Sequence, residues 1–188
     1  MKTLLLVRHA KSSWDLATLN DFDRSLNERG KKDAPVMAQR LLDRKIDINI
    51  FVSSPAKRAK KTAELFCSIY KKDKEQIIFV PALYHASLNT FFEVVTQLND
   101  DYNCVAIFSH NPVITEFVNQ LVENVTIAGS NVSFAMEQKL RRCFTISAAS
   151  CVCSSIDSSP IAASAISNLR TNQLSAQRFI CCIARSHC

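Results

Sequence analysis

The stretch LLLVRHAK, residues 4–11, decides the fold. Its first four residues, Leu4 to Val7, form an apolar run of the length expected for a strand buried inside a domain. The run ends directly in Arg8 and His9, two polar side chains that a buried strand does not need for its own stability. We therefore expect the end of this strand to deliver an arginine and a histidine to a functional site.

Short apolar segments alternate with segments of helical periodicity up to about residue 124. The predicted strands are residues 3–7, 48–52, 77–80 and 104–108, and the predicted helices are residues 33–44, 55–70, 90–98 and 112–122. Asn27 and Glu28 would suit a helix start, but Gly30 and Pro35 fit poorly in a helix interior, so we expect the first regular helix near Asp33. This alternation predicts an α/β domain of three layers, in which a mostly parallel sheet has helices on both faces.

Polar side chains follow three of the predicted strands. Arg8 and His9 come after the first strand, Ser53 and Ser54 with Arg58 after the second, and Ser109, His110 and Asn111 after the fourth. Ligands of open α/β sheets bind beyond the carboxyl ends of the strands. The sequence therefore predicts that two arginines and two histidines meet at one edge of the sheet, whereas the serines suit turn and helix-cap positions.

Four motifs now carry a resemblance to a known family: LLLVRHAKS, DFDRSLNERG, VSSPAKRAKKTAE and AIFSHNPVI, in this order. With them, residues 1–122 resemble the histidine phosphatase superfamily and, within it, the small SixA-like phosphohistidine phosphatases. The resemblance implies a phosphoglycerate mutase-like fold. One departure is Ala10, where many members of the superfamily have glycine.

The resemblance implies that His9 is the nucleophile, with His110, Arg8 and Arg58 as further catalytic residues. Attack on phosphorus needs an unprotonated nitrogen, which histidine supplies near pH 7. The phosphoryl oxygens would be bound by Arg8, Arg24, Arg58 and His110, because guanidinium groups hold such oxygens with paired donors. We expect no metal or other cofactor, since these cations already stabilise the anion. An alternative for Arg24 is simple pairing with Asp21 or Asp23.

The segment PALYHASLN, residues 81–89, bears on the substrate because it contains no carboxylate. Mutases and broad phosphatases of the superfamily place a glutamate general acid in this region. An imidazole leaving group has a pKa near roughly 6.5 and departs without the help that an alkoxide requires. We therefore expect a metal-independent phosphatase acting through a phosphohistidine intermediate on His9, with phosphohistidine in a protein as substrate. His85 could act as an acid or be an ordinary loop histidine.

Two alternatives stay open: a small-molecule phosphomonoesterase of the same superfamily, and an impaired product of a disrupted gene. The formal net charge of +6 suggests a nucleic-acid-binding protein, but residues 1–124 carry 17 basic and 15 acidic residues and lack a basic strip with aromatics. Arg8 interrupts the first apolar run before it reaches the roughly 7–15 residues of a secretory signal. We expect a cytoplasmic protein whose partners are phosphorylated substrates, neither nucleic acid nor membrane.

Residues 125–188 differ in composition from the rest of the chain. They contain six of the eight cysteines and few acidic residues, with a Cys/Ser-rich pattern typical of out-of-frame translation. SixA-like proteins should continue here with strands that complete the sheet, yet only residues 132–135 could form one, and nothing after them has convincing periodicity. We predict an atypical, mostly irregular tail in which the cysteine spacing indicates neither zinc binding nor a disulfide framework.

Overall fold

The computed structural model describes residues 3–14, 20–126 and 178–182. The strands are β1 (Thr3–Arg8), β2 (Ile50–Ser53), β3 (Ile78–Phe79), β4 (Cys104–Ser109) and β5 (Arg178–Cys182), and the α-helices are α1 (Glu28–Asp43), α2 (Lys57–Ile69), α3 (Leu88–Thr96) and α4 (Val113–Thr126). Short 3-10 helices occupy Asp21–Asp23 (η1), Lys74–Gln76 (η2) and Pro81–Leu83 (η3). The strands pair in the order β3-β2-β4-β1-β5, and every pair is parallel.

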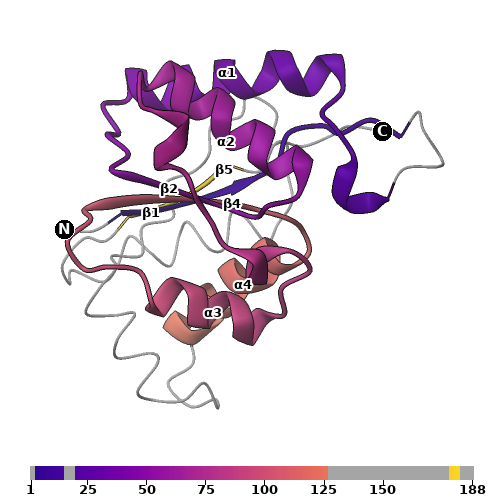
Figure 1. The fold of residues 1–188 in the computed structure, drawn as a ribbon. Helices are drawn as coiled ribbons and strands as arrows, with labels where there is room; N and C mark the ends of the chain where they lie inside the picture. The colour runs from indigo at the N-terminus through magenta and orange to yellow at the C-terminus, as the bar shows by residue number, and fades with distance from the viewer. Residues whose placement is uncertain (1–2, 15–19, 127–177, 183–188) are drawn as a thin grey trace.

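The sheet is the middle of three layers, with α1 and α2 on one face and α3 and α4 on the other (Figure 1). Successive side chains of a strand point to opposite faces. In β1, Leu5 and Val7 belong to the cluster with the α1 and α2 residues, whereas Leu4 and Leu6 belong to the cluster with the α3 and α4 residues. The predicted three-layer α/β architecture is therefore confirmed.

Strand register brings the polar segments together at the carboxyl edge of the sheet. Arg8 lies opposite Ser109 in the pairing of β1 with β4, and Ser53 lies opposite Phe108 in the pairing of β2 with β4. The backbone N–H of His9 then donates to the carbonyl oxygen of Ser109 at 3.1 Å. Because the three strands end level with one another, the residues that follow them share one site.

Helix α1 begins earlier than predicted. The Asn27 side chain caps it by accepting a hydrogen bond from the Gly30 N–H at 2.8 Å, and regular helix runs from Glu28, so the expected start near Asp33 is wrong. Glycine is required at position 30 because a Cβ there would lie 2.2 Å from the carbonyl oxygen of Lys11. The sequence pattern did not indicate this close approach, and Pro35 lies inside the helix.

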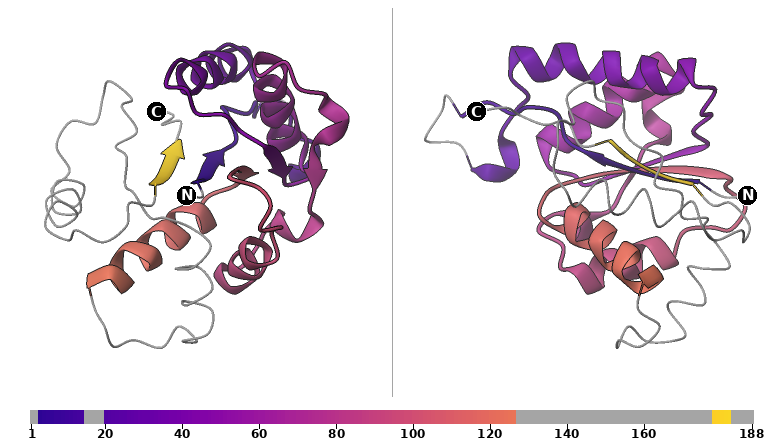
Figure 2. Two further views of the ribbon diagram at one scale, coloured as in Figure 1. Left: turned by 90° about the vertical axis from the view of Figure 1, so that its left-hand side faces the viewer. Right: turned by 180° about the vertical axis from the view of Figure 1, so that it is seen from behind.

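Strand β5 is a regular element within the segment predicted to be mostly irregular. Residues 178–182 lie in a part of the chain that shows no convincing periodicity, yet they pair in parallel with β1 along its free edge (Figure 2). Helix α4 also continues to Thr126, two residues beyond the boundary expected at 124. The candidate strand at 132–135 and the rest of the tail lie outside the described residues. In the described part of the chain, no helix has the length and apolarity needed to cross a membrane.

Replacement of Gly30 by alanine tests the contact between α1 and the loop after β1. Alanine normally stabilises a helix interior by about 1 kcal/mol relative to glycine. Here the new Cβ would meet the Lys11 backbone, so Gly30→Ala should instead lower the free energy of unfolding by about 1–3 kcal/mol. Urea denaturation of the full chain measures this, with Lys32→Ala on the exposed face of α1 as control. A stabilised Gly30→Ala variant would contradict the close approach.

Candidate active site

The loop that carries His9 is held by neighbours on two helices. The Ala10 N–H donates to Thr62 Oγ1 of α2 at 3.1 Å, and the Asn27 N–H at the start of α1 donates to the carbonyl oxygen of Lys11 at 3.0 Å. Both contacts fix backbone atoms on the carboxyl side of His9. The loop that presents the histidine is therefore anchored to the same helices that cover one face of the sheet.

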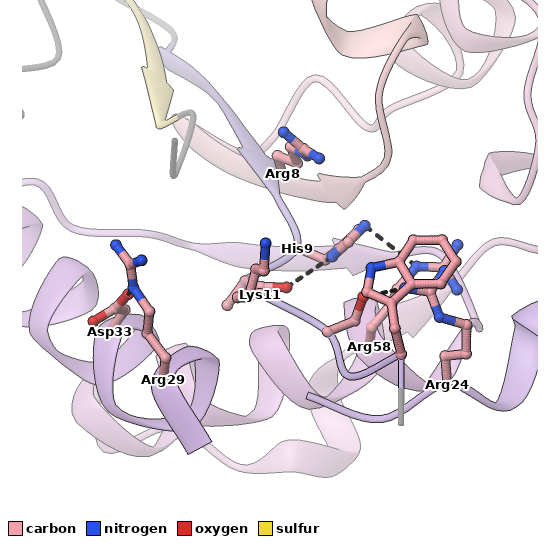
Figure 3. A pocket seen from close by; sticks show the side chains of 10 residues that line it. Arg8, His9, Lys11, Arg24, Arg29, Asp33 and Arg58 are labelled. Carbon is pink, nitrogen blue, oxygen red and sulfur yellow. Dashed lines mark hydrogen bonds and ion pairs between the residues drawn. The ribbon is translucent and has the colours of Figure 1, made fainter. Parts of the chain in front are cut away.

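Hydrogen bonds assign the tautomer of His9 (Figure 3). Its Nδ1 lies 2.8 Å from the carbonyl oxygen of Ala10. Since a carbonyl oxygen only accepts, Nδ1 carries the proton and donates it. The other nitrogen, Nε2, accepts from the Nε–H of Arg58 at 3.2 Å. The ring therefore presents an unprotonated Nε2 on the side of the arginine.

The surroundings of His9 keep its ring neutral. The pKa of His9 is lowered from 6.5 to about 4, mainly by burial and in addition by the positive charges of Arg58, Arg8 and Arg24, which together outweigh the opposing hydrogen bond to Ala10. At neutral pH the imidazole therefore has a free lone pair on Nε2. This is the protonation state that a nucleophile needs.

A single carboxylate, that of Asp21 in η1, orients two arginines. Arg58 of α2 is buried and donates from its two terminal nitrogens to Asp21, one bond reaching Oδ2 at 2.8 Å and the other reaching the backbone oxygen. Arg24 donates to Asp21 Oδ1 at 2.9 Å and to Ser12 Oγ at 2.8 Å. We call this arrangement of Asp21, Arg24 and Arg58 the carboxylate bridge.

Asp21 is ionised throughout the neutral range. Its partial burial opposes ionisation, but hydrogen bonds from Arg58 and Arg24, together with one from the Tyr84 hydroxyl at 3.1 Å, outweigh burial and lower its pKa to about 2. From the sequence, Asp21 was expected only as an alternative partner of Arg24. The structure confirms this pairing but adds Arg58, which lies 37 residues away in the chain and which spacing alone could not have indicated.

A cavity of about 300 Å³ opens beside His9. The charged side chains that line it are Arg8, Lys11, Arg24, Arg29, Asp33 and Arg58. Five are cations, and the one carboxylate pairs with Arg29 at 3.2 Å. In Figure 3, Arg8 and Lys11 extend toward the space beside the His9 ring, while Arg29 and Asp33 stand at the far end. The cavity has the size and charge for a small anionic group such as phosphoryl.

Trp14 forms part of the same wall. The guanidinium carbon of Arg24 lies 3.4 Å from the centroid of the indole ring, a close cation–π contact. The rest of Trp14 is exposed, which is unusual for a large apolar side chain. Arg24 is thus held by Asp21, by Ser12 and by this ring, and its guanidinium is fixed at the mouth of the cavity.

His110 lies beside His9, and it is not among the residues that line the cavity. The two ring centroids are 5.1 Å apart, and His110 Nε2 is 2.9 Å from the hydroxyl oxygen of Ser54. Burial lowers the pKa of His110 to about 3, with smaller effects from His9 and Arg58. The ring is therefore neutral in the resting protein.

His85 is placed differently from the other candidates. Its side chain is 72% exposed, and its Nε2 is 3.9 Å from Asp21 Oδ2. The backbone of His85 has a φ of 51°, in the left-handed region, next to Tyr84, whose ring is 4.1 Å away. His85 therefore sits at the rim of the carboxylate bridge, outside the group formed by the two buried histidines.

The predicted residues thus fall into one site. Arg8, His9, Arg24 and Arg58 line the cavity, and His110 contacts the His9 ring from the neighbouring strand end. Within the three described ranges, no group of three or more His, Cys, Asp or Glu side chains is arranged to hold a metal ion. What the arrangement can do chemically is bind an oxyanion beside a neutral imidazole nitrogen.

Comparisons with known proteins identify what the chain is similar to. Residues 4–84 match the model of the histidine phosphatase superfamily (branch 1). A solved structure of a SixA protein from Agrobacterium tumefaciens is 26% identical and superposes with a TM-score of 0.58, over 65% of this chain and 78% of that one. Residues 4–84 therefore match the histidine phosphatase superfamily, and the chain is similar to SixA proteins within it.

Two curated relatives with different activities match part of the chain. A 2,3-bisphosphoglycerate-dependent phosphoglycerate mutase of Bartonella henselae is 31% identical over 84 residues, which are 44% of this chain and 41% of that protein. Phosphoserine phosphatase 1 of Hydrogenobacter thermophilus is 43% identical over 65 residues, which are 34% of this chain and 30% of that protein. The chain spans less than half of the length of the curated relatives it matches.

The shifted pKa values predict how stability depends on pH. In the folded chain the pKa of His9 is about 4 and that of His110 about 3, both below the ordinary 6.5. Between pH 6.5 and about 4, the unfolded chain binds more protons than the folded chain. The free energy of unfolding should therefore fall as the pH drops from 6.5 toward 4. The contribution of Asp21 is present above pH 3.8 and is lost only as the pH falls through about 2.

Urea denaturation of the full chain between pH 7.5 and 4.5 measures this loss, and an NMR titration of His9 should give a midpoint near pH 4. The matched control is His9→Asn, which keeps a polar group but does not titrate and should lose less stability over the same interval. A His9 midpoint at 6.5 would contradict the burial and charge described for this ring.

Proposed function

We propose that this chain is a metal-independent phosphatase that acts through a phosphohistidine intermediate on His9 and takes its phosphoryl group from phosphohistidine in a protein. The observation that carries the proposal is the state of His9. Its Nδ1–H donates to the carbonyl oxygen of Ala10. Its Nε2 lone pair faces Arg58, at a cavity lined by five cationic side chains. A neutral nucleophile beside a cationic cavity suits attack on a phosphoryl group.

The first step transfers the phosphoryl group to the enzyme. The Nε2 lone pair of His9 attacks phosphorus, a P–N bond forms, and the bond to the leaving group breaks. Arg8, Arg24, Arg58 and His110 hold the phosphoryl oxygens, and the Arg58 hydrogen bond to Nε2 passes to an oxygen of the substrate. The positive charge that the ring gains remains at Nδ1–H, which the Ala10 carbonyl accepts.

The second step returns the enzyme to its resting state. A water molecule attacks phosphorus in line, the P–N bond breaks, and its electron pair goes back to Nε2 of His9. Inorganic phosphate leaves with the oxygen and the protons of the water. Five cationic side chains around the cavity stabilise the charge in both transition states, in the way that arginines and metal ions do in other phosphoryl transfers.

The protonation of the site favours phosphohistidine as the substrate. Asp21 is the carboxylate that contacts the arginines, and with a pKa of about 2 it cannot donate a proton at neutral pH. The segment 81–89 has no carboxylate. A substrate imidazole protonated on its second nitrogen leaves as a neutral ring and needs no acid. The likeness to SixA supports the same choice.

A small-molecule phosphomonoesterase is the second candidate. The matches to a phosphoglycerate mutase and to a phosphoserine phosphatase favour it. An alkoxide leaving group would need an acid, and His85, which is exposed 3.9 Å from Asp21, is the imidazole positioned to supply one. The two candidates therefore differ in their dependence on His85.

Replacement of the nucleophile tests the proposal directly. His9→Ala should lower turnover of a phosphohistidine peptide by at least about a thousandfold, because no other imidazole is found among the described residues that line the cavity. Turnover is followed by phosphate release from the full chain, with and without EDTA, and EDTA should leave the wild-type rate unchanged. Full activity in His9→Ala, or loss of wild-type activity on chelation, would reject the mechanism.

Replacement of His85 separates the two candidates. His85→Gln keeps a polar side chain at the rim but removes the acid, so it should change phosphohistidine turnover by less than about twofold. Hydrolysis of phosphoserine, whose leaving group is an alkoxide, should fall about tenfold or more if His85 protonates it. A wild type that turns over phosphoserine faster than phosphohistidine, and that loses this activity in His85→Gln, would favour the phosphomonoesterase.

A further inference from the structure

Ser54 contacts His110 at the centre of the site. Ser54 follows β2 directly, is fully buried, and has its Oγ 2.9 Å from Nε2 of His110. The same Oγ accepts a longer hydrogen bond, 3.4 Å, from the N–H of Ala56. From the sequence, this serine was expected to serve in a turn or as a helix cap. The contact with His110 joins two residues 56 positions apart and is not explained by capping.

The other nitrogen of His110 has no partner among the described residues. His110 is 8% exposed, and its Nδ1 is buried without a hydrogen bond to any of them. Buried polar atoms are nearly always hydrogen-bonded. A buried nitrogen without a partner beside a candidate site therefore indicates an atom that a bound ligand can pair with. The ring lies against that of His9, 5.1 Å between centroids, next to the proposed phosphoryl-accepting nitrogen.

The hydroxyl of Ser54 decides which nitrogen of His110 carries the proton. A neutral imidazole has one N–H and one acceptor nitrogen, and the low pKa of His110 keeps its ring neutral. The 2.9 Å contact by itself allows either group to donate, but within the described ranges Nε2 is the acceptor that lies at hydrogen-bond distance from the Ser54 O–H. If Nε2 held the proton, this buried hydroxyl would be left without an acceptor, so donation from the O–H to Nε2, with the ring proton on Nδ1, is the arrangement that satisfies it.

We propose that Ser54 is a positioning residue: its hydroxyl donates to Nε2 of His110, keeps the proton on Nδ1, and so gives His110 the N–H that binds a phosphoryl oxygen. A phosphoryl oxygen only accepts hydrogen bonds, so the opposite tautomer would present a lone pair to it and repel it. The role at the phosphoryl group rests on the proposed function, whereas the tautomer of the resting protein does not.

Neighbouring serines provide a matched pair of variants. Ser53 is also fully buried, but its Oγ donates to the backbone oxygen of Ser54 at 2.9 Å and does not contact His110. Ser53→Ala therefore removes a buried hydroxyl one residue away without touching the imidazole. Ser54→Ala removes the donor to Nε2, and Ser54→Thr keeps a hydroxyl at the same position.

The experiment is ¹⁵N NMR of the full chain with labelled histidine at pH 7, with His110→Gln used to assign the signals. In the wild type, Nδ1 of His110 should have the shift of a protonated nitrogen and Nε2 that of an acceptor. Ser54→Ala should move the protonated population toward Nε2, and Ser53→Ala should not. A wild-type His110 protonated on Nε2 would overturn the proposal without any variant.

Kinetics test the consequence for the phosphoryl group. Ser54→Ala should lower kcat/KM for a phosphohistidine peptide about tenfold to a hundredfold, with Ser54→Thr restoring most of it and Ser53→Ala remaining near the wild type. Equal losses in Ser53→Ala and Ser54→Ala would overturn the positioning role. If the wild type does not turn over phosphohistidine, the proposed function fails, but the NMR result still decides the tautomer.

Discussion

The pairing of the Asp21 carboxylate with Arg58 and Arg24 is the interaction on which the site depends. Arg58 is a buried charge, and such a charge is tolerated only with a partner that satisfies its donors. Because Asp21 occupies both terminal nitrogens of Arg58, the remaining Nε–H points at His9 Nε2. Asp21 thus orients the arginine beside the nucleophile and, by staying ionised, cannot act as an acid. The contact of Asp21 with the two arginines therefore fixes two of the cations that line the cavity, and it leaves Asp21 unable to protonate a leaving group at neutral pH.

Most of the site was predictable because it depends on where strands end. Arg8 ends β1, and His9 and His110 follow β1 and β4 directly; parallel register places such residues together whatever the details of packing. The prediction that Arg24 belongs to the site rested on the family resemblance alone. The role of Asp21 was missed, since its contact with Arg58 depends on how the η1 segment folds back over α2, and no local spacing encodes that.

The features of the fold that the sequence did not predict also depend on contacts between residues that lie far apart in the chain. Gly30 is tolerated inside α1 because Lys11 leaves no room for a side chain, and this overrides the local preference against glycine. Strand β5 is a five-residue run whose paired residues in β1 lie 175 positions earlier, so periodicity within the run could not reveal the pairing. The interpretation of residues 125–188 as an out-of-frame tail stays a prediction.

The position of the phosphoryl group on the trapped enzyme tests the central claim most directly. The full chain is reacted with a phosphohistidine peptide, quenched in alkali, and analysed by ³¹P NMR and by mass spectrometry of its peptides. Because Nδ1 of His9 is bound to Ala10 and Nε2 faces Arg58, the account predicts a phosphoramidate on Nε2 of His9. A phosphoryl group on Nδ1, on another residue, or on none while turnover proceeds would contradict it.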